Sequence, residues 1–287
     1  MPVPRVALVN AGAAMPLQGL REAVDMGLAE PILVGDPVKI RAAALEIGWD
    51  IIPFRLIDAP GETASPAAAA LARASEADCI MKGQVHTSTF LKGLLPSAAG
   101  LRDKGSICSH IFHITAPHSD RPLLLTDAAL NIAPDIATRQ ASLTHAIALA
   151  QMLGIARPKA ALLAASEDPT PGLTATYESA EIASWALQAL PQAIVQGPIA
   201  LDLIFSRAAA LAKNYTSEVS GDADIIVVPE VTTGNALYKL MVLGMGCCAA
   251  GLVLGARVPI LLTSRSQQAA DRIATAALGA IVAGMSR

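Results

Sequence analysis

Two uninterrupted apolar runs constrain the fold of this 287-residue chain more than any other feature. The first, residues 225–228, lies within Asp224–Pro229, and the second covers residues 258–262. Neither run alternates apolar with polar residues, which is typical of strands buried on both faces of a parallel sheet. Polar residues follow each run before a helical pattern begins. Because the carboxyl ends of such strands form the ligand crevices of α/β proteins, both junctions are candidate anion sites.

The first third of the chain alternates short apolar runs with segments of helical periodicity. This rhythm predicts a mainly parallel sheet with helices on both faces. The expected strands cover residues 5–10, 31–34, 51–56 and 78–81, and the expected helices cover residues 17–27, 37–47 and 66–75.

A hairpin and a second alternation follow. The turn-like segment 116–120 separates two strand-like runs, which predicts an antiparallel pair at this point. A long helical pattern then precedes a fresh βα alternation, so a change of domain is expected near residue 135. The expected strands cover 106–115, 122–126, 160–165 and 193–196, and the expected helices cover 136–154, 177–190 and a segment from 197–202 to residue 213.

Composition excludes several classes of protein. Hydrophobic residues make up 53% of the chain, so a large core can form, while a net charge of −3 and 3% aromatics argue against nucleic-acid binding. The four cysteines show no C-x-x-C pair, and the N-terminus lacks a signal-peptide pattern, so we expect a cytoplasmic protein. The uncharged segment 240–256 is interrupted by glycines and is expected to form a buried helix and strand rather than a membrane span.

Three histidines raise the possibility of a metal site. His110, His113 and His118 are close in sequence, but His110 and His113 point to opposite faces if they lie on one strand. Metal binding needs convergent ligands. A metal- and NAD-dependent dehydrogenase, with Asp127 as a further ligand, therefore stays an alternative to the main hypothesis.

The polar residues at predicted strand ends are the candidate site residues. The chain contains no Walker phosphate loop, no G-x-G-x-x-G fingerprint and no G-x-S-x-G elbow. Ser264 and Arg265 follow a strand and open a helix, where a phosphate could meet backbone N–H groups and a guanidinium. The alternative is that Ser264 only caps the helix. Asp271 lies about two helical turns further on and could act as a general base, although most helix-surface aspartates only meet water.

Lys82 precedes a polar turn that opens another helix, which could also be an ordinary capped helix start. The other candidates at strand ends are Thr126, Asp127, Asn131, Asp202, Thr233, Asn235 and Lys239.

Six motifs in fixed order resemble the phosphate acetyltransferase and phosphate butyryltransferase family over nearly the whole chain. Each motif is weak alone, but their order and spacing together are specific. The motifs cover residues 126–131, 197–202, 220–224, 229–230, 234–239 and 259–265.

The resemblance implies an α/β fold of two domains, similar to isocitrate and isopropylmalate dehydrogenases, with an interdomain cleft. It places residues 1–135 and 254–287 in an end-built domain and residues 136–253 in a middle domain. It also implies a homodimer, with neither a nucleic acid nor a membrane as partner.

The activity implied by the resemblance is reversible transfer of a short acyl group between coenzyme A and inorganic phosphate. Coenzyme A would be a substrate, with no tightly bound cofactor and no metal. By matching position, Ser264 would stabilise the transition state, Arg265 would hold phosphate or polarise the carbonyl, and Asp271 would deprotonate the thiol. Lys82, Thr126, Asp127, Asn131, Thr233, Asn235 and Lys239 would bind substrate.

The chain departs from the family in ways that leave the acyl group open. Ser266 stands where acetyltransferases have glycine, and Asp271 occupies a position where butyryltransferases often lack an aspartate. The chain therefore mixes features of both branches. A non-catalytic module that binds acyl-coenzyme A and regulates a partner is the third hypothesis, although the intact Ser264–Arg265 pair argues against a degenerate site.

Overall fold

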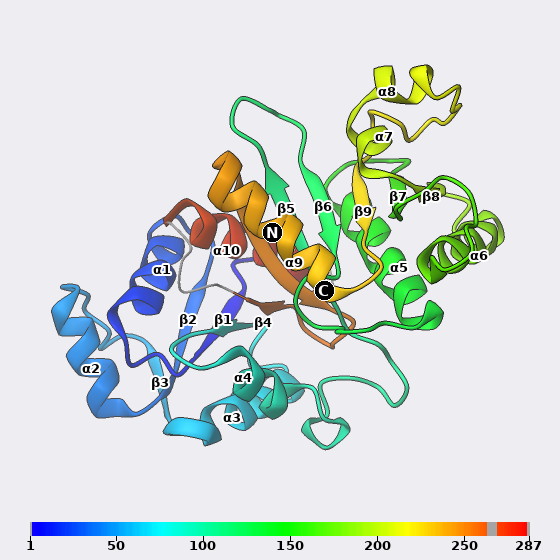
Figure 1. Cartoon of the computed structure of the whole chain (residues 1–287). Coiled ribbons are helices and arrows are strands. Elements are labelled where there is room, and N and C mark those ends of the chain that lie inside the picture. The colour runs from blue at the N-terminus through cyan, green and yellow to red at the C-terminus, as the bar shows by residue number, and fades with distance from the viewer. Residues whose placement is uncertain (1, 263–268, 286–287) are drawn as a thin grey trace. The chain divides into compact units, whose positions relative to one another are not determined.

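The computed structural model describes residues 2–262 and 269–285 (Figure 1). The chain divides into two compact units. The end-built unit comprises Met1–Ser106 and Ala250–Arg287, and the middle unit comprises Ile107–Ala249. The boundaries expected from the sequence lie after residues 135 and 253. The boundaries between the compact units lie after Ser106 and Ala249.

The end-built unit contains the parallel sheet that the sequence predicts. Its strand order is β3-β2-β1-β4-β11-β10, in which β10 alone runs antiparallel to its neighbour β11. The central strands β1 and β4 are almost entirely buried, in keeping with their apolar sequences. The strands are β1 (Arg5–Val9), β2 (Glu30–Gly35), β3 (Arg55–Asp58), β4 (Cys79–Lys82), β11 (Ile260–Leu261) and β10 (Cys248–Leu254), of which β10 enters this unit at Ala250.

The helices of this unit pack in pairs. α1 lies against α10, and α3 lies against α4 and β1. The α3–α4 contact is close, because a Cβ atom on Gly93 would lie 2.4 Å from the Cβ atom of Ser65. The helices are α1 (Ala14–Asp25), α2 (Pro37–Glu46), α3 (Ala64–Arg73), α4 (Thr87–Leu94) and α10 (Ala269–Met285), with short 3₁₀ turns η1 (Gly61–Thr63) and η2 (Ser97–Ala99).

The middle unit has the strand order β5-β6-β9-β7-β8. β5 and β6 form the predicted antiparallel hairpin, and the remaining pairs are parallel. Because β6 pairs with β9, the hairpin belongs to this unit, which is why the unit begins earlier than residue 136. The strands are β5 (Ser109–Thr115), β6 (Leu123–Thr126), β7 (Lys159–Leu163), β8 (Ile194–Ile199) and β9 (Ile225–Val227).

Two local predictions were wrong. The expected helix up to residue 213 is broken at Ser206, whose backbone is extended and whose side chain accepts a hydrogen bond from the Ala209 N–H at 3.1 Å. The expected strand 51–56 begins as a turn, because the Phe54 N–H bonds to the Ile51 carbonyl at 3.1 Å. The helices of the unit are α5 (Ile136–Met152), α6 (Thr174–Ala189), α7 (Leu201–Phe205), α8 (Arg207–Ala212) and α9 (Val231–Lys239), followed by a π turn, η3 (Leu240–Gly244).

The segment 240–256 forms η3 and β10, a short helical turn and a strand as predicted. The strand is buried, but Leu240 and Leu243 of the turn are exposed. Within residues 2–262 and 269–285, no helix combines the length and the apolar character that crossing a membrane requires.

Candidate functional site

The carboxyl ends of the central strands form the first part of the site. Lys82 ends β4, pairs with Val9 of β1 and is only 4% exposed. The strands approach so closely here that a Cβ atom on Gly83 would lie 2.3 Å from the Val9 carbonyl oxygen. β11 runs parallel to β4 and pairs Leu261 with Met81, so its carboxyl end lies beside that of β4. The predicted catalytic residues Ser264 and Arg265 lie outside the described residues.

Asp271, the third predicted catalytic residue, lies in the first turn of α10 and is 3% exposed. Its carbonyl oxygen accepts a hydrogen bond from the Thr275 hydroxyl at 2.8 Å. Burial of a carboxylate is costly unless it is paired. This environment distinguishes Asp271 from a helix-surface aspartate that only meets water.

A second set of predicted residues gathers after β6 in the middle unit. The Asp127 carboxylate accepts hydrogen bonds from the backbone N–H groups of His110, Ala129 and Leu130 at 3.0, 3.0 and 2.8 Å. It also accepts one from the Asn131 side-chain amide at 2.7 Å. These contacts satisfy both carboxylate oxygens and fix the turn after β6. Asp127 therefore shapes the backbone at the strand end.

The start of α9 packs directly on this turn. A Cβ atom on Gly234 would lie 2.8 Å from the Asp127 carbonyl oxygen, so only glycine permits this approach without a shift. The Asn235 side-chain amide donates to the Ala128 carbonyl at 3.4 Å. Thr126 is fully buried at the end of β6. The structure therefore brings Thr126, Asp127 and Asn235 together, as expected from parallel β6 and β9.

Glu230, which sequence reasoning missed as a site residue, organises the first turn of α9. Its carboxylate accepts hydrogen bonds from the Thr232 and Thr233 N–H groups at 2.6 and 2.7 Å and from the Thr233 hydroxyl. The Thr233 side chain is the main cause that lowers the pKa of Glu230 to about 2. The signal in the sequence was an acidic residue between the apolar strand and a helix start, where caps are common.

Lys239 lies apart from this cluster. It is exposed in the last turn of α9, about 9 Å along the helix axis from Thr233 at 1.5 Å per residue. A basic residue at a helix C-terminus is favoured by the helix dipole, which is sufficient to account for its position.

The three histidines do not converge. His110 is 1% exposed and lies edge-on to Phe112, with ring centroids 4.3 Å apart, and burial lowers the pKa of its imidazole to about 4. Burial also lowers the pKa of His113, whereas His118 is exposed in the hairpin loop. In the part of the chain that the structure describes, no three His, Cys, Asp or Glu side chains form a group able to hold a metal ion.

The fold and these strand ends define an α/β protein whose polar residues gather where parallel strands end, the position at which this class binds ligands. The family described as "Phosphate acetyl/butaryl transferase" matches residues 61–280. The chain is 38% identical to a phosphate acetyltransferase of Rhizobium meliloti, covering 94% of this chain and 86% of the relative. It is 34% identical to a phosphate butyryltransferase of Clostridium acetobutylicum, covering 98% of this chain and 93% of the relative.

A solved branched-chain phosphotransacylase from Enterococcus faecalis V583 is also similar, with 29% identity and a TM-score of 0.81 over 97% of this chain and 99% of that one. The chain therefore belongs to the phosphate acetyl/butyryl transferase family, and the resemblance seen in the sequence is confirmed.

The Glu230 cap generates a pH-dependent prediction. In the folded state the pKa of Glu230 is lowered from 4.5 to about 2. The stabilisation that its ionised carboxylate gives the fold is therefore complete above pH 4.5 and is lost as the pH falls toward 2. Glu230→Ala should lower the free energy of unfolding by about 1 kcal/mol at pH 7, the usual effect of losing a cap. The difference in the free energy of unfolding between this variant and wild type should shrink as unfolding curves are recorded at lower pH. Exposed Glu218→Ala serves as control, and a pH-independent Glu230 effect would refute the assignment.

Proposed function

We propose that this protein is a phosphate acyltransferase that reversibly transfers a short acyl group, such as acetyl or butyryl, between coenzyme A and inorganic phosphate. The observation that carries the proposal is the family match over residues 61–280, together with relatives of both branches that align over nearly the full chain. The dehydrogenase and the non-catalytic module are not favoured by these relatives.

The proposed reaction needs a base, an anion site and a donor to the developing oxyanion. The coenzyme A thiolate attacks the carbonyl carbon of the acyl phosphate, a C–S bond forms, and the C–O bond to phosphate breaks. A thiol with an ordinary pKa near 8.5 is mostly neutral at pH 7, so a base that takes its proton assists attack. Asp271 is proposed as that base, Arg265 as the ligand of phosphate, and Ser264 as the donor to the tetrahedral oxyanion.

The remaining predicted residues are proposed to hold the substrates. Lys82 supplies a cation at the end of β4, and Lys239 supplies one on α9. Thr126, Asp127, Asn131, Thr233 and Asn235 are proposed to form the coenzyme-facing edge of the middle unit. Since the Asp127 carboxylate already accepts hydrogen bonds from its own turn, its contribution is to position that edge.

The proposal includes a fold of the isocitrate and isopropylmalate dehydrogenase type with an interdomain cleft. The presence of two α/β units, one built from both chain ends, supports it. Coenzyme A acts as a substrate in this scheme, with no tightly bound cofactor and no metal, and the cytoplasm is the proposed location.

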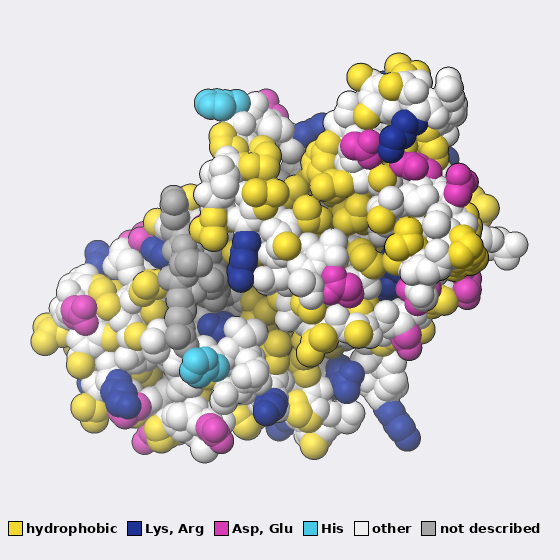
Figure 2. Space-filling model, in the orientation of Figure 1, with side chains coloured by type: hydrophobic (Ala, Val, Ile, Leu, Met, Phe, Trp, Pro, Cys, Tyr) yellow, Lys and Arg dark blue, Asp and Glu magenta, His cyan; other side chains and the backbone are white. Residues whose placement is uncertain are grey.

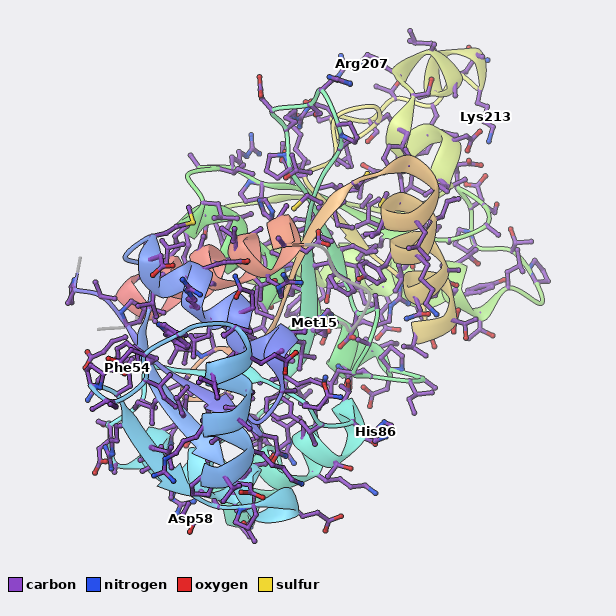
Figure 3. All side chains as sticks on the ribbon, turned by 90° about the vertical axis from the view of Figure 1, so that its left-hand side faces the viewer. Met15, Phe54, Asp58, His86, Arg207 and Lys213 are labelled. Atoms are coloured by element: carbon purple, nitrogen blue, oxygen red, sulfur yellow. The ribbon has the colours of Figure 1, made fainter. Side chains whose placement is uncertain are left out.

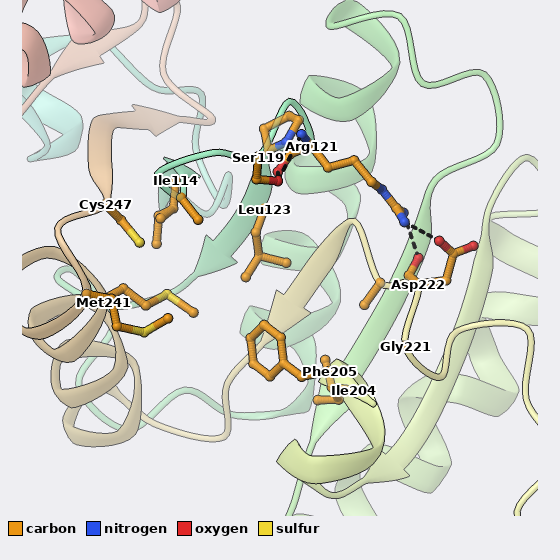
Figure 4. Close-up of a pocket in the computed structure, with 14 residues that line it drawn as sticks. Ile114, Ser119, Arg121, Leu123, Ile204, Phe205, Gly221, Asp222, Met241 and Cys247 are labelled. Atoms are coloured by element: carbon orange, nitrogen blue, oxygen red, sulfur yellow. Dashed lines mark hydrogen bonds and ion pairs between the residues drawn. The ribbon is translucent and has the colours of Figure 1, made fainter. Parts of the chain in front are cut away.

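We also propose a homodimer that uses an apolar surface of the middle unit. A cavity of about 310 Å³ is lined mainly by Ile114, Leu123, Ile204, Phe205, Met241 and Cys247 (Figure 4). Two of its lining residues, Phe205 and Met245, are 55 and 56% exposed. Figure 2 shows hydrophobic side chains gathered between the β5–β6 hairpin and α7–α8. A two-fold interface must be self-complementary, and this surface offers both a hollow and protruding apolar groups.

The dimer can be tested with a charge placed on this surface. Met245→Glu should convert a dimer to a monomer in sedimentation velocity, because a buried unpaired carboxylate is strongly disfavoured at an interface. Leu187→Glu on α6, where the native leucine is 75% exposed, is the matched control and should stay dimeric. A wild-type monomer, or a Met245 variant that remains dimeric, would exclude this interface.

The activity is tested by mixing the protein with coenzyme A and a series of acyl phosphates from acetyl to valeryl, and recording thioester absorbance. We expect turnover without added metal and a broad acyl profile, since one methylene changes binding by only about 1–3 kcal/mol. Arg265→Ala should lower the turnover number by about 100-fold or more while circular dichroism stays unchanged. Arg41→Ala, an exposed arginine on α2, should retain full activity. Absence of thioester with every acyl phosphate would refute the proposed function, and an active Arg265 variant would move the phosphate site elsewhere.

A further inference from the structure

An arginine that the proposed reaction does not use lies directly after Asp271 in the first turn of α10. The Arg272 side chain is only 13% exposed, because it packs against α1 within the end-built unit. Figure 1 shows α1 and α10 next to each other, and Figure 3, in which Met15 marks the beginning of α1, shows the same two helices from a second direction. A guanidinium enclosed in this way requires compensating polar or charged groups.

Gly19 of α1 forms the notch that admits this arginine. A Cβ atom at position 19 would lie 2.8 Å from Cδ of Arg272 and 2.9 Å from its Nε. The atoms that a methyl group would meet thus belong to the flexible part of the arginine and not to the backbone of α10. A side chain at position 19 would therefore push the guanidinium out of its place while both helices stay where they are.

Glu22, one turn after Gly19, supplies a compensating charge. Its carboxylate oxygen Oε2 lies 3.9 Å from Nη2 of Arg272, and its oxygen Oε1 accepts a hydrogen bond from the Gln18 side-chain amide at 3.0 Å. Oε2 is buried and accepts no hydrogen bond from the described residues. A buried carboxylate oxygen in this situation is costly unless a nearby charge compensates it, and partial burial reduces screening by salt. The guanidinium of Arg272 provides that charge.

Thr275 holds the same helical turn from another side. Its fully buried hydroxyl accepts a hydrogen bond from the Gly251 N–H of β10 at 3.4 Å and donates one to the Asp271 carbonyl at 2.8 Å. At about 3.6 residues per turn, Thr275 lies between Asp271 and Arg272 around the helix, about 40° from the first and about 60° from the second. The contact of Thr275 with β10 and that of Arg272 with α1 together hold α10 against rotation about its axis. The direction of the Asp271 side chain is thereby fixed.

We propose that Arg272 is a positioning residue of the acyl transfer, whose contacts with Gly19 and Glu22 hold the first turn of α10 so that the Asp271 carboxylate reaches the thiol proton. The inference rests on the proposed function, in which Asp271 is the base. Proton transfer requires the two heavy atoms to be within hydrogen-bond reach, so a displacement of about 1 Å is enough to impair it. Arg272 touches neither substrate in this role, so its loss lowers turnover and not the affinity for coenzyme A.

Three substitutions interrupt the contact at different points. Arg272→Met removes the guanidinium, Glu22→Gln removes the partner charge, and Gly19→Ala closes the notch with a residue that favours the helix. Each should lower the turnover number with acetyl or butyryl phosphate about ten-fold and leave the KM for coenzyme A within about two-fold of wild type. Asp25→Asn is the matched control, because it removes a carboxylate of α1 that pairs with Arg21 of the same helix, and it should retain wild-type turnover.

A double-mutant cycle shows whether Arg272 acts through Asp271. Asp271→Asn should lower turnover about 100-fold, the usual effect of losing a general base, and adding Arg272→Met should lower it by less than about two-fold further. Circular dichroism and thermal unfolding identify a variant that fails to fold. If Arg272→Met is such a variant, Glu22→Gln takes its place in the cycle.

Three results would refute the positioning role and leave the acyltransferase proposal intact. They are losses that multiply in the double variant, full turnover of Asp271→Asn, and single variants whose KM rises while turnover stays unchanged. Wild-type turnover in all three folded single variants would refute it equally. A wild-type protein that forms no thioester would refute the proposed function and the positioning role with it.

Discussion

Parallel pairing of strands that are buried on both faces is the constraint on which this structure depends. It sends the carboxyl ends of the parallel strands in each unit to one edge, where backbone groups and polar side chains can meet a ligand. In the end-built unit this edge contains Lys82, and close pairing of β1 with β4 requires glycine at position 83. In the middle unit the same constraint places Thr126 beside the strand that leads to Glu230. The candidate site residues are thus positioned by sheet geometry.

The sequence was most informative where burial alone determines structure. The apolar runs at 225–228 and 258–262 become β9 and β11, and the hairpin is antiparallel as predicted. It was least informative where one polar contact decides a boundary. Ser206 breaks a helix that periodicity would continue, and a turn at Ile51–Phe54 delays β3. Such contacts depend on local competition for backbone donors, which apolar periodicity does not record.

In the candidate site, too, the sequence predicted where polar residues lie along the chain but not their burial or their contacts. Spacing placed Asp271 on a helix, but its burial follows from packing of α10 in the end-built unit. Asp127 was identified as a polar residue at a strand end, yet its role in holding the turn depends on His110, 17 positions earlier. The proposal that these residues serve acyl transfer rests on several motifs in fixed order and on the family match over residues 61–280, rather than on any one contact.

The most direct test of the account follows both halves of the reaction at once. Phosphorus NMR of the protein with butyryl- or acetyl-coenzyme A and inorganic phosphate should show an acyl phosphate resonance growing as the phosphate signal falls. Free thiol, titrated in parallel, should appear in equal amount. Thiol release without acyl phosphate would indicate hydrolysis, and an unchanged spectrum would indicate no transfer; either result would contradict assignment of this chain as a phosphate acyltransferase.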